Sequence, residues 1–235
     1  MKRTILSAAA LLLALAGQAQ EDSAAGSERS QWLTPFDRVE VDAAVEIRFE
    51  QVPAGQAPSI LFDTKGDDDT KFRAEVREGT LRIRERVDLH RPRQTSVTVR
   101  YHALRALTLT DAAATVDGVL SACLFDLTVG ARSSFEAELD VQDLAMELSG
   151  ESRATLTGQV RYLTLEASTG QVDAAGMTCM AARVNAQNKA RVTLDATDRL
   201  EFRATTGATV DNKTTPALLR NNRSFWQRAA DRAAE

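Results

Sequence analysis

The sequence is poor in the side chains that usually carry enzyme chemistry. It has two histidines, His90 and His102, and two cysteines, Cys123 and Cys179, and it lacks a Gly-x-Ser-x-Gly nucleophile elbow. Both histidines precede the regular part of the chain, and we interpret them as solvent-facing or capping residues. Aromatic residues make up 5% of the chain, which suits a narrow interior filled by Ala, Val and Leu. These shortages argue against nucleophilic catalysis, and the sequence predicts no cofactor.

The chain also lacks a net positive charge, since its acidic residues slightly outnumber its basic ones. The formal net charge of the whole chain is −4, and it becomes −6 when the two charges of Lys2 and Arg3 are lost with the leader described next. A nucleic-acid or anionic-membrane partner would need a clustered basic surface. The acidic balance therefore argues against both partners.

Only one long apolar run occurs, and it lies at the N-terminus. Lys2 and Arg3 precede the run at residues 5–16, and Gly17-Gln-Ala19 supplies the small residues that a signal peptidase needs. The run is too short to span a membrane comfortably. We predict a secretory signal peptide at residues 1–19, hence export to the periplasm or cell surface, with a short membrane anchor as the alternative. No transmembrane segment is expected after cleavage.

The second half of the chain repeats with a period of about 19 residues. Such a period holds two or three strands and no helix, so each copy is predicted to be one coil of a β-solenoid that buries its apolar edge on its neighbours. Two rows of inward residues keep the period independently: Leu109, Val129, Leu148, Ala167, Ala186 and Ala204, and then Val116, Phe135, Ala154, Val172, Val192 and Val210.

The remaining segments are assigned around this repeat. Residues 20–33 are small and polar and are predicted to be a disordered leader. Residues 34–220 are predicted to form a single β-solenoid domain, with N-terminal strands and hairpins over 34–103 and regular coils over 104–220. Residues 221–235 form a C-terminal tail, predicted as a short helix whose Phe225 and Trp226 cap the open end of the solenoid.

The two cysteines are expected to stay unpaired. They are 56 residues apart, close to three coils, and three coils stacked at about 4.8 Å would separate them by roughly 14 Å. A disulfide needs Cα atoms within about 7 Å. We therefore predict two buried thiols that occupy a similar phase of the coil.

The order of these segments resembles a known bacterial family. The similar segments are Phe36-Asp-Arg-Val-Glu-Val-Asp with Val45-Glu-Ile-Arg-Phe-Glu-Gln, Glu78-Gly-Thr-Leu-Arg-Ile, Val97-Thr-Val-Arg-Tyr-His-Ala-Leu-Arg-Ala-Leu, and tandem turns ending at Pro216. Over about residues 36–220 the chain resembles the family called putative auto-transporter adhesin, head GIN domain. The resemblance implies an exported, right-handed β-helix-like fold without assigned catalytic residues. The expected fold class is therefore all-β, a right-handed parallel β-helix or β-solenoid.

Two polar rows beside the inward residues form the candidate ligand-binding surface. They stack at about 4.8 Å per coil, and from them we select Asp117, Glu136, Arg153, Asp173, Arg191 and Asp211. Carboxylates beside arginines on a flat β-face suit a polysaccharide lyase or glycosidase. The simpler interpretation is the polar exterior that every soluble solenoid needs.

A metal site is not predicted. Asp63, Asp67, Asp68 and Asp69 could supply oxygen ligands to Ca²⁺, but their spacing lacks the Asp-x-Asp-x-Asp-Gly order with a distal Glu. The sequence as a whole favours an exported, non-enzymatic module of the cell envelope that binds or adheres to a glycan, a surface polymer or another protein. Two alternatives stay open: a polysaccharide-acting lyase or hydrolase, and an envelope scaffold that self-assembles through the solenoid ends.

Overall fold

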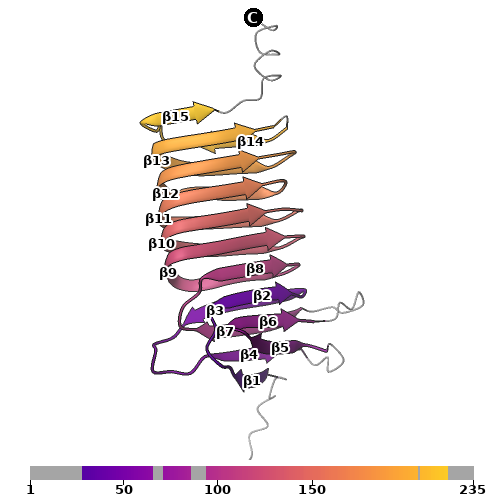
Figure 1. Cartoon of the computed structure of the whole chain (residues 1–235). Helices are drawn as coiled ribbons and strands as arrows, with labels where there is room; N and C mark the ends of the chain where they lie inside the picture. Colours follow the sequence, from indigo (N-terminus) through magenta and orange to yellow (C-terminus); the bar gives the residue numbers. More distant parts are fainter. Residues whose placement is uncertain (1–27, 66–70, 86–93, 206, 222–235) are drawn as a thin grey trace, which may run out of the picture.

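The computed structural model describes residues 28–65, 71–85, 94–205 and 207–221, and the described residues contain fifteen strands and no helix (Figure 1). The signal peptide and the C-terminal helix predicted beyond Asn221 lie outside the described residues. Within them, no helix is long and apolar enough to cross a membrane. The strands are β1 (Glu28–Trp32), β2 (Arg38–Asp42), β3 (Val45–Gln51), β4 (Ser59–Asp63), β5 (Arg73–Arg77), β6 (Thr80–Arg84), β7 (Thr95–Tyr101), β8 (Ala106–Thr110), β9 (Ala113–Gly130), β10 (Ser134–Leu148), β11 (Arg153–Ala167), β12 (Gln171–Ala186), β13 (Arg191–Ala204), β14 (Thr209–Asn212) and β15 (Leu218–Asn221).

Strands β9 to β13 stack in parallel, one coil on the next, which confirms the predicted β-solenoid of about 19-residue coils. Apart from Val116, in whose place Ala114 pairs with Phe135, the predicted inward rows are columns of this stack. One column runs through Phe135, Ala154, Val172, Val192 and Val210, and the other through Val129, Leu148, Ala167, Ala186 and Ala204. The handedness of the coil stays a prediction.

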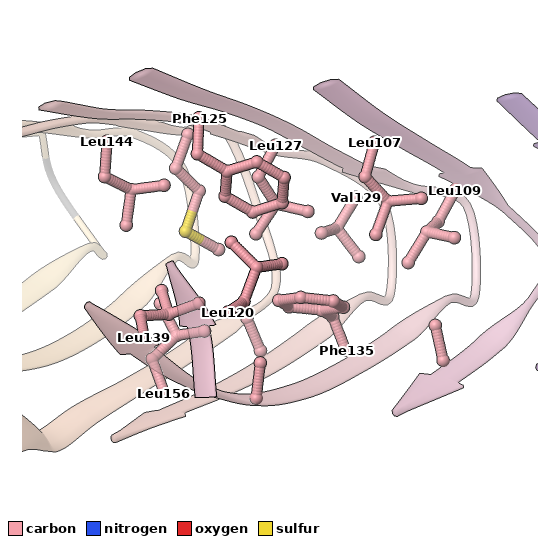
Figure 2. Packing of buried hydrophobic residues seen from close by; sticks show 14 of the residues in the cluster. Leu107, Leu109, Leu120, Phe125, Leu127, Val129, Phe135, Leu139, Leu144 and Leu156 are labelled. Atoms are coloured by element: carbon pink, nitrogen blue, oxygen red, sulfur yellow. The ribbon is translucent and has the colours of Figure 1, made fainter. Parts of the chain in front are cut away.

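Each long strand bends, so that one strand contributes to both walls of the solenoid. In β10, Phe135 and Leu139 enter the core from one wall and Leu144 enters it from the other (Figure 2). The bend is visible in the burial pattern, because alternation holds as far as Val141 and two consecutive residues, Gln142 and Asp143, then face solvent. The same doubling recurs at Arg161-Tyr162 in β11. Apolar side chains from both walls fill the space between the walls.

The bend explains why one cysteine differs from its prediction. Both thiols are free, as expected, but Cys123 is exposed and only Cys179 is buried. Cys123 and Leu124 are the two consecutive outward residues at the bend of β9, whereas Cys179 pairs with Val160 in a core-facing column. The two cysteines are therefore one position out of phase, and the prediction that both are buried is wrong for Cys123.

The folded protein is expected to react with a thiol reagent at Cys123 alone. Burial, together with the charge of Asp195, raises the pKa of Cys179 to about 11, so at about pH 8 its reactive thiolate is scarce. Mass spectrometry after iodoacetamide treatment should show one adduct on the folded chain and two after unfolding in urea. The variant Cys123→Ser should stay unlabelled until it is unfolded. Rapid labelling of Cys179 in the folded protein would contradict its burial.

The N-terminal strands continue the stack and close its end. β2 pairs in parallel with β6 and β8, and β3 with β7 and β9. Parallel pairing therefore begins upstream of residue 104, where the sequence predicts that the regular coils start. Antiparallel pairs complete this region, since β5 pairs with β6 and β4 lies between β1 and β7. The side chains of Phe49 and Tyr101 meet edge to face here, with ring centroids 6.3 Å apart.

Glycine at position 158 lets two adjacent coils approach closely. Gly158 pairs with Leu139 of the preceding coil and has a φ of +96°. A Cβ added there would collide with the carbonyl oxygen of Leu139 and lie 2.9 Å from its backbone nitrogen. Only glycine accommodates both the backbone conformation and this contact.

Candidate ligand-binding groove

The turns that follow β9 to β13 lie above one another along one edge of the solenoid, on the right in Figure 1. Four residues separate Leu148 from Arg153, and four separate Ala186 from Arg191. The intervening turn is shorter, because only residues 168–170 separate Ala167 from Gln171. One short turn thus lies between two longer ones.

A groove of about 780 Å³ lies at this short turn. The hollow follows from the difference in length, because the flanking turns have one residue more than the turn between them. The residues that line it come from four successive coils: Arg132, Gly150, Glu151, Ser152, Arg153, Thr169, Gly170, Gln171, Lys189 and Arg191.

Local hydrogen bonds fix the walls of the groove. The buried hydroxyl of Ser152 donates to the carbonyl of Ser149 at 2.7 Å, which closes the turn before the short one. In the turn after it, Asn188 has a positive φ of 54° and its side-chain amide donates to the carbonyl of Ser168 at 3.0 Å. Gly170, with a φ of +87°, packs against Ser152, since an added Cβ would lie 2.6 Å from the Ser152 carbonyl oxygen. The groove is therefore built on ordered backbone.

The groove is basic although the protein is acidic. Four cationic side chains line it, those of Arg132, Arg153, Lys189 and Arg191, against the single carboxylate of Glu151. Arg132 pairs with Asp111 at 3.2 Å. Among the described residues, no carboxylate lies within 4.0 Å of the other three cations. An open concave site with uncompensated positive charge attracts anionic ligands.

The structure brings two of the candidate residues into this groove. Arg153 and Arg191 stand in one column with Gln171 between them, two coils apart. That spacing corresponds to about 9.6 Å along the solenoid axis. The two arginines thus present a pair of regularly spaced cations on one face.

The acidic candidates lie elsewhere. Glu136, Asp173 and Asp211 share a neighbouring outward column, in which Thr155 and Thr193 separate them. None of these three carboxylates lines the groove. They are exposed side chains on the flat face of the coils.

Asp117 falls outside that column, contrary to its predicted place. Glu136 pairs with Thr115, and Phe135 pairs with Ala114 in place of Val116. A bulge in β9 between Thr115 and Val119, with Gly118 at a φ of +74°, shifts the register by two residues. Asp117 instead pairs with Glu50 and makes an ion pair with Arg48 at 3.3 Å.

Sequence reasoning missed the turn residues of the groove. Arg132, Glu151 and Lys189 hold equivalent positions in three turns, but the repeat marks a turn only by the small residues that let the chain bend. The signal that could have found them is the step from Ala154 to Val172, which is one residue shorter than the step before it. That shortening lies in the turn at residues 168–170.

The titratable groups with shifted pKa values lie outside the groove. Burial raises the pKa of Tyr101 to about 12. Glu201 in β13 meets Arg199 at 2.8 Å, Arg220 at 3.4 Å and Arg183 at 3.6 Å. Desolvation acts to raise the pKa of Glu201, but the hydrogen bond from Arg199 and the charges of the three arginines hold it below its ordinary value. This cluster joins β15 to β13, so the shifted pKa of Glu201 belongs to a structural contact.

The structure also bears on His102 and on the acidic residues considered as Ca²⁺ ligands. The ring of His102 lies 2.6 Å from the carbonyl oxygen of Gln56, which fits a residue that holds a loop in place. In the part of the chain that the structure describes, no group of three or more His, Cys, Asp or Glu side chains is placed to hold a metal ion. Asp67, Asp68, Asp69 and His90 lie outside the described residues.

These features define a parallel β-solenoid with an open basic groove along its turn edge. The chain belongs to the family described as putative auto-transporter adhesin, head GIN domain, whose model matches residues 35–216. A search of curated proteins finds no match.

Solved structures share the fold at low sequence identity. A putative adhesin from Bacteroides fragilis superposes with a TM-score of 0.76 at 14% identity, covering 84% of this chain and 92% of that one. A putative lipid binding protein from Parabacteroides distasonis and a putative adhesin from Parabacteroides merdae each have a TM-score of 0.56 at 12% identity, covering 84% of this chain and 94% of theirs. At these identities the likeness establishes the fold alone.

Proposed function

We propose that the protein is an exported, non-enzymatic binding module of the cell envelope that adheres to a glycan or other surface polymer. The observation that carries this proposal is the open basic groove on the turn edge, a concave surface with three cations that have no carboxylate within 4.0 Å among the described residues. Membership of an adhesin-like family and the predicted signal peptide support export.

The groove suits binding better than hydrolysis. A glycosidase uses two carboxyl groups, about 5–9.5 Å apart, on either side of the scissile bond. The groove residues include one carboxylate, Glu151, which is exposed. The outward carboxylates Glu136 and Asp173 lie two coils apart, with Thr155 between them, and neither lines the groove. The site therefore offers charge and shape for recognition without the paired groups of an acid–base mechanism.

A glycan array with the chain from residue 20 onward tests the proposal. We expect binding to at least one class of polymer, with the polymer recovered at its original length after prolonged incubation. Size-exclusion chromatography of the incubated polymer provides the second readout. Shortening of the polymer would favour the lyase or hydrolase alternative, and an array on which nothing is bound would refute glycan adhesion.

A further inference from the structure

We propose that the turn-edge groove binds an acidic polysaccharide laid along the solenoid axis, with its anionic groups on Arg153 and Arg191. The proposal rests on the proposed function and specifies its site and ligand class. Carboxylates and sulfates share the required chemistry, which is an anionic oxygen cluster that accepts hydrogen bonds from a guanidinium group.

The excess of positive charge in the groove favours a negatively charged ligand. Arg153, Lys189 and Arg191 lie within it without a carboxylate partner among the described residues, and Glu151 supplies its one negative charge. Cations that are already paired gain little from a ligand, because a ligand must first displace the partner. These three cations are exposed and free to pair with an incoming anion.

The spacing of the arginines selects a polymer over a single small anion. Arg153 and Arg191 occupy the same column two coils apart, about 9.6 Å along the axis. One carboxylate or sulfate cannot bridge that distance, whereas a chain with a charged group on every second sugar can reach both. Gln171, between the two arginines, places an uncharged amide beside the intervening sugar.

The shape of the groove suits a chain segment as well. The short turn contributes Thr169, whose side chain is small, and Gly170, which has none, and the groove has the volume of an ordinary ligand site. Because it lies across the outer edge of successive coils, an internal stretch of a long polymer can enter it without threading an end.

A single-stranded nucleic acid fits less well. Proteins that bind such strands combine basic grooves with aromatic side chains on which bases stack. The residues that line this groove include no aromatic side chain, and Tyr162 lies at the bend of β11, away from the turns. Charge without stacking surfaces favours a polysaccharide.

The test compares the affinities of the chain from residue 20 onward for polygalacturonate, dextran sulfate, neutral dextran and a single-stranded oligonucleotide. We expect the two acidic polysaccharides to bind more tightly than the other two, with affinity that falls as salt rises. The variant Gln171→Glu places a negative charge between the two arginines and should weaken binding about tenfold. The variants Arg153→Gln and Arg191→Gln should each weaken it about three- to fivefold.

Matched controls change residues of the same two types, glutamine and arginine, at the bend. Gln142→Glu and Arg161→Gln make identical charge changes at exposed positions outside the groove and should leave the affinity within about twofold of the unmodified chain. Equal losses in the groove and control variants would reveal a general charge effect and overturn the proposal. Tightest binding to the oligonucleotide would overturn it in favour of a nucleic-acid ligand.

The outcomes separate this proposal from the broader one. If the protein binds neutral dextran as tightly as the acidic polymers, and Gln171→Glu has no effect, glycan adhesion stands and the groove assignment fails. If no polysaccharide binds, both fail. Preference between polygalacturonate and dextran sulfate identifies whether carboxylates or sulfates are the preferred anions.

Discussion

Replacing Gly158 with alanine is expected to destabilise the protein more than the same substitution at Gly118 or Gly55. The new Cβ would meet the backbone of Leu139 in the adjacent coil, and an L-residue would have to adopt a φ of +96°. Strain in such a conformation costs about 1–3 kcal/mol. Overpacking against a backbone that cannot move aside costs about another 1–3 kcal/mol. Urea denaturation should therefore show a loss of about 2–6 kcal/mol in the free energy of unfolding.

The other two glycines separate the contributions of strain and collision. Gly118 also has a positive φ, +74°, but nothing lies within 4 Å of the point that an added Cβ would occupy, so Gly118→Ala should cost about 1–2 kcal/mol from strain alone. Gly55 has open space and no positive φ, so Gly55→Ala should change stability by about 0.5 kcal/mol or less. Equal stabilities for the Gly158 and Gly55 variants would show that the coils do not approach as closely as described.

The second large effect is expected in the core. Leu127 in β9 is 1% exposed and packs between the two walls, close to Phe125 (Figure 2). Truncation to alanine removes buried apolar surface and leaves a cavity that stacked coils cannot close by a local shift. Leu127→Ala should therefore lower the free energy of unfolding by about 2–5 kcal/mol in urea denaturation.

A leucine three positions earlier on the same strand provides the control. Leu124 is 51% exposed because it lies at the bend, so Leu124→Ala should change stability by about 0.5 kcal/mol or less. A loss of the same size at both positions would contradict the described bend. It would indicate that Leu124 is covered in solution, for example by a second copy of the chain.

The columns of the solenoid could be predicted from the sequence because the core itself is periodic. Phe135, Ala154 and Val172 are one coil apart in the sequence and adjacent in the stack. Each coil must present apolar residues to the same interior, so the pattern in the chain directly reflects the pattern in space. The free state of both cysteines followed from the same spacing.

The errors arise where the chain departs from the regular coil. The bulge in β9 shifts the register by two residues, and an even shift keeps inward residues inward. Val116 and Asp117 therefore match the inward and outward pattern, and they fit the period of about 19 residues better than Ala114 and Thr115, which the structure pairs with Phe135 and Glu136. At the bend two outward residues follow one another, which places Cys123 on the surface and not in the core.

The groove could be predicted only in part, for a different reason. Arg153 and Arg191 belong to a strand column and were found from the repeat. Arg132 and Lys189 lie in turns, where no burial constrains the residue type, so the period says nothing of their role. The net charge of the whole chain is negative, and this average does not reveal that the turn edge is basic.

The three-residue turn at 168–170 has a consequence for how such proteins diversify. Backbone hydrogen bonds join each coil to the next on both sides of the turn, from Ser168 to Leu148 at 3.0 Å and from Gln171 to Ser152 at 3.0 Å. A turn can therefore gain or lose a residue while the buried columns keep their register. Family members that share this core can acquire, reshape or lose a hollow on this edge through a single codon insertion or deletion, so that ligand preference can diverge while stability is conserved.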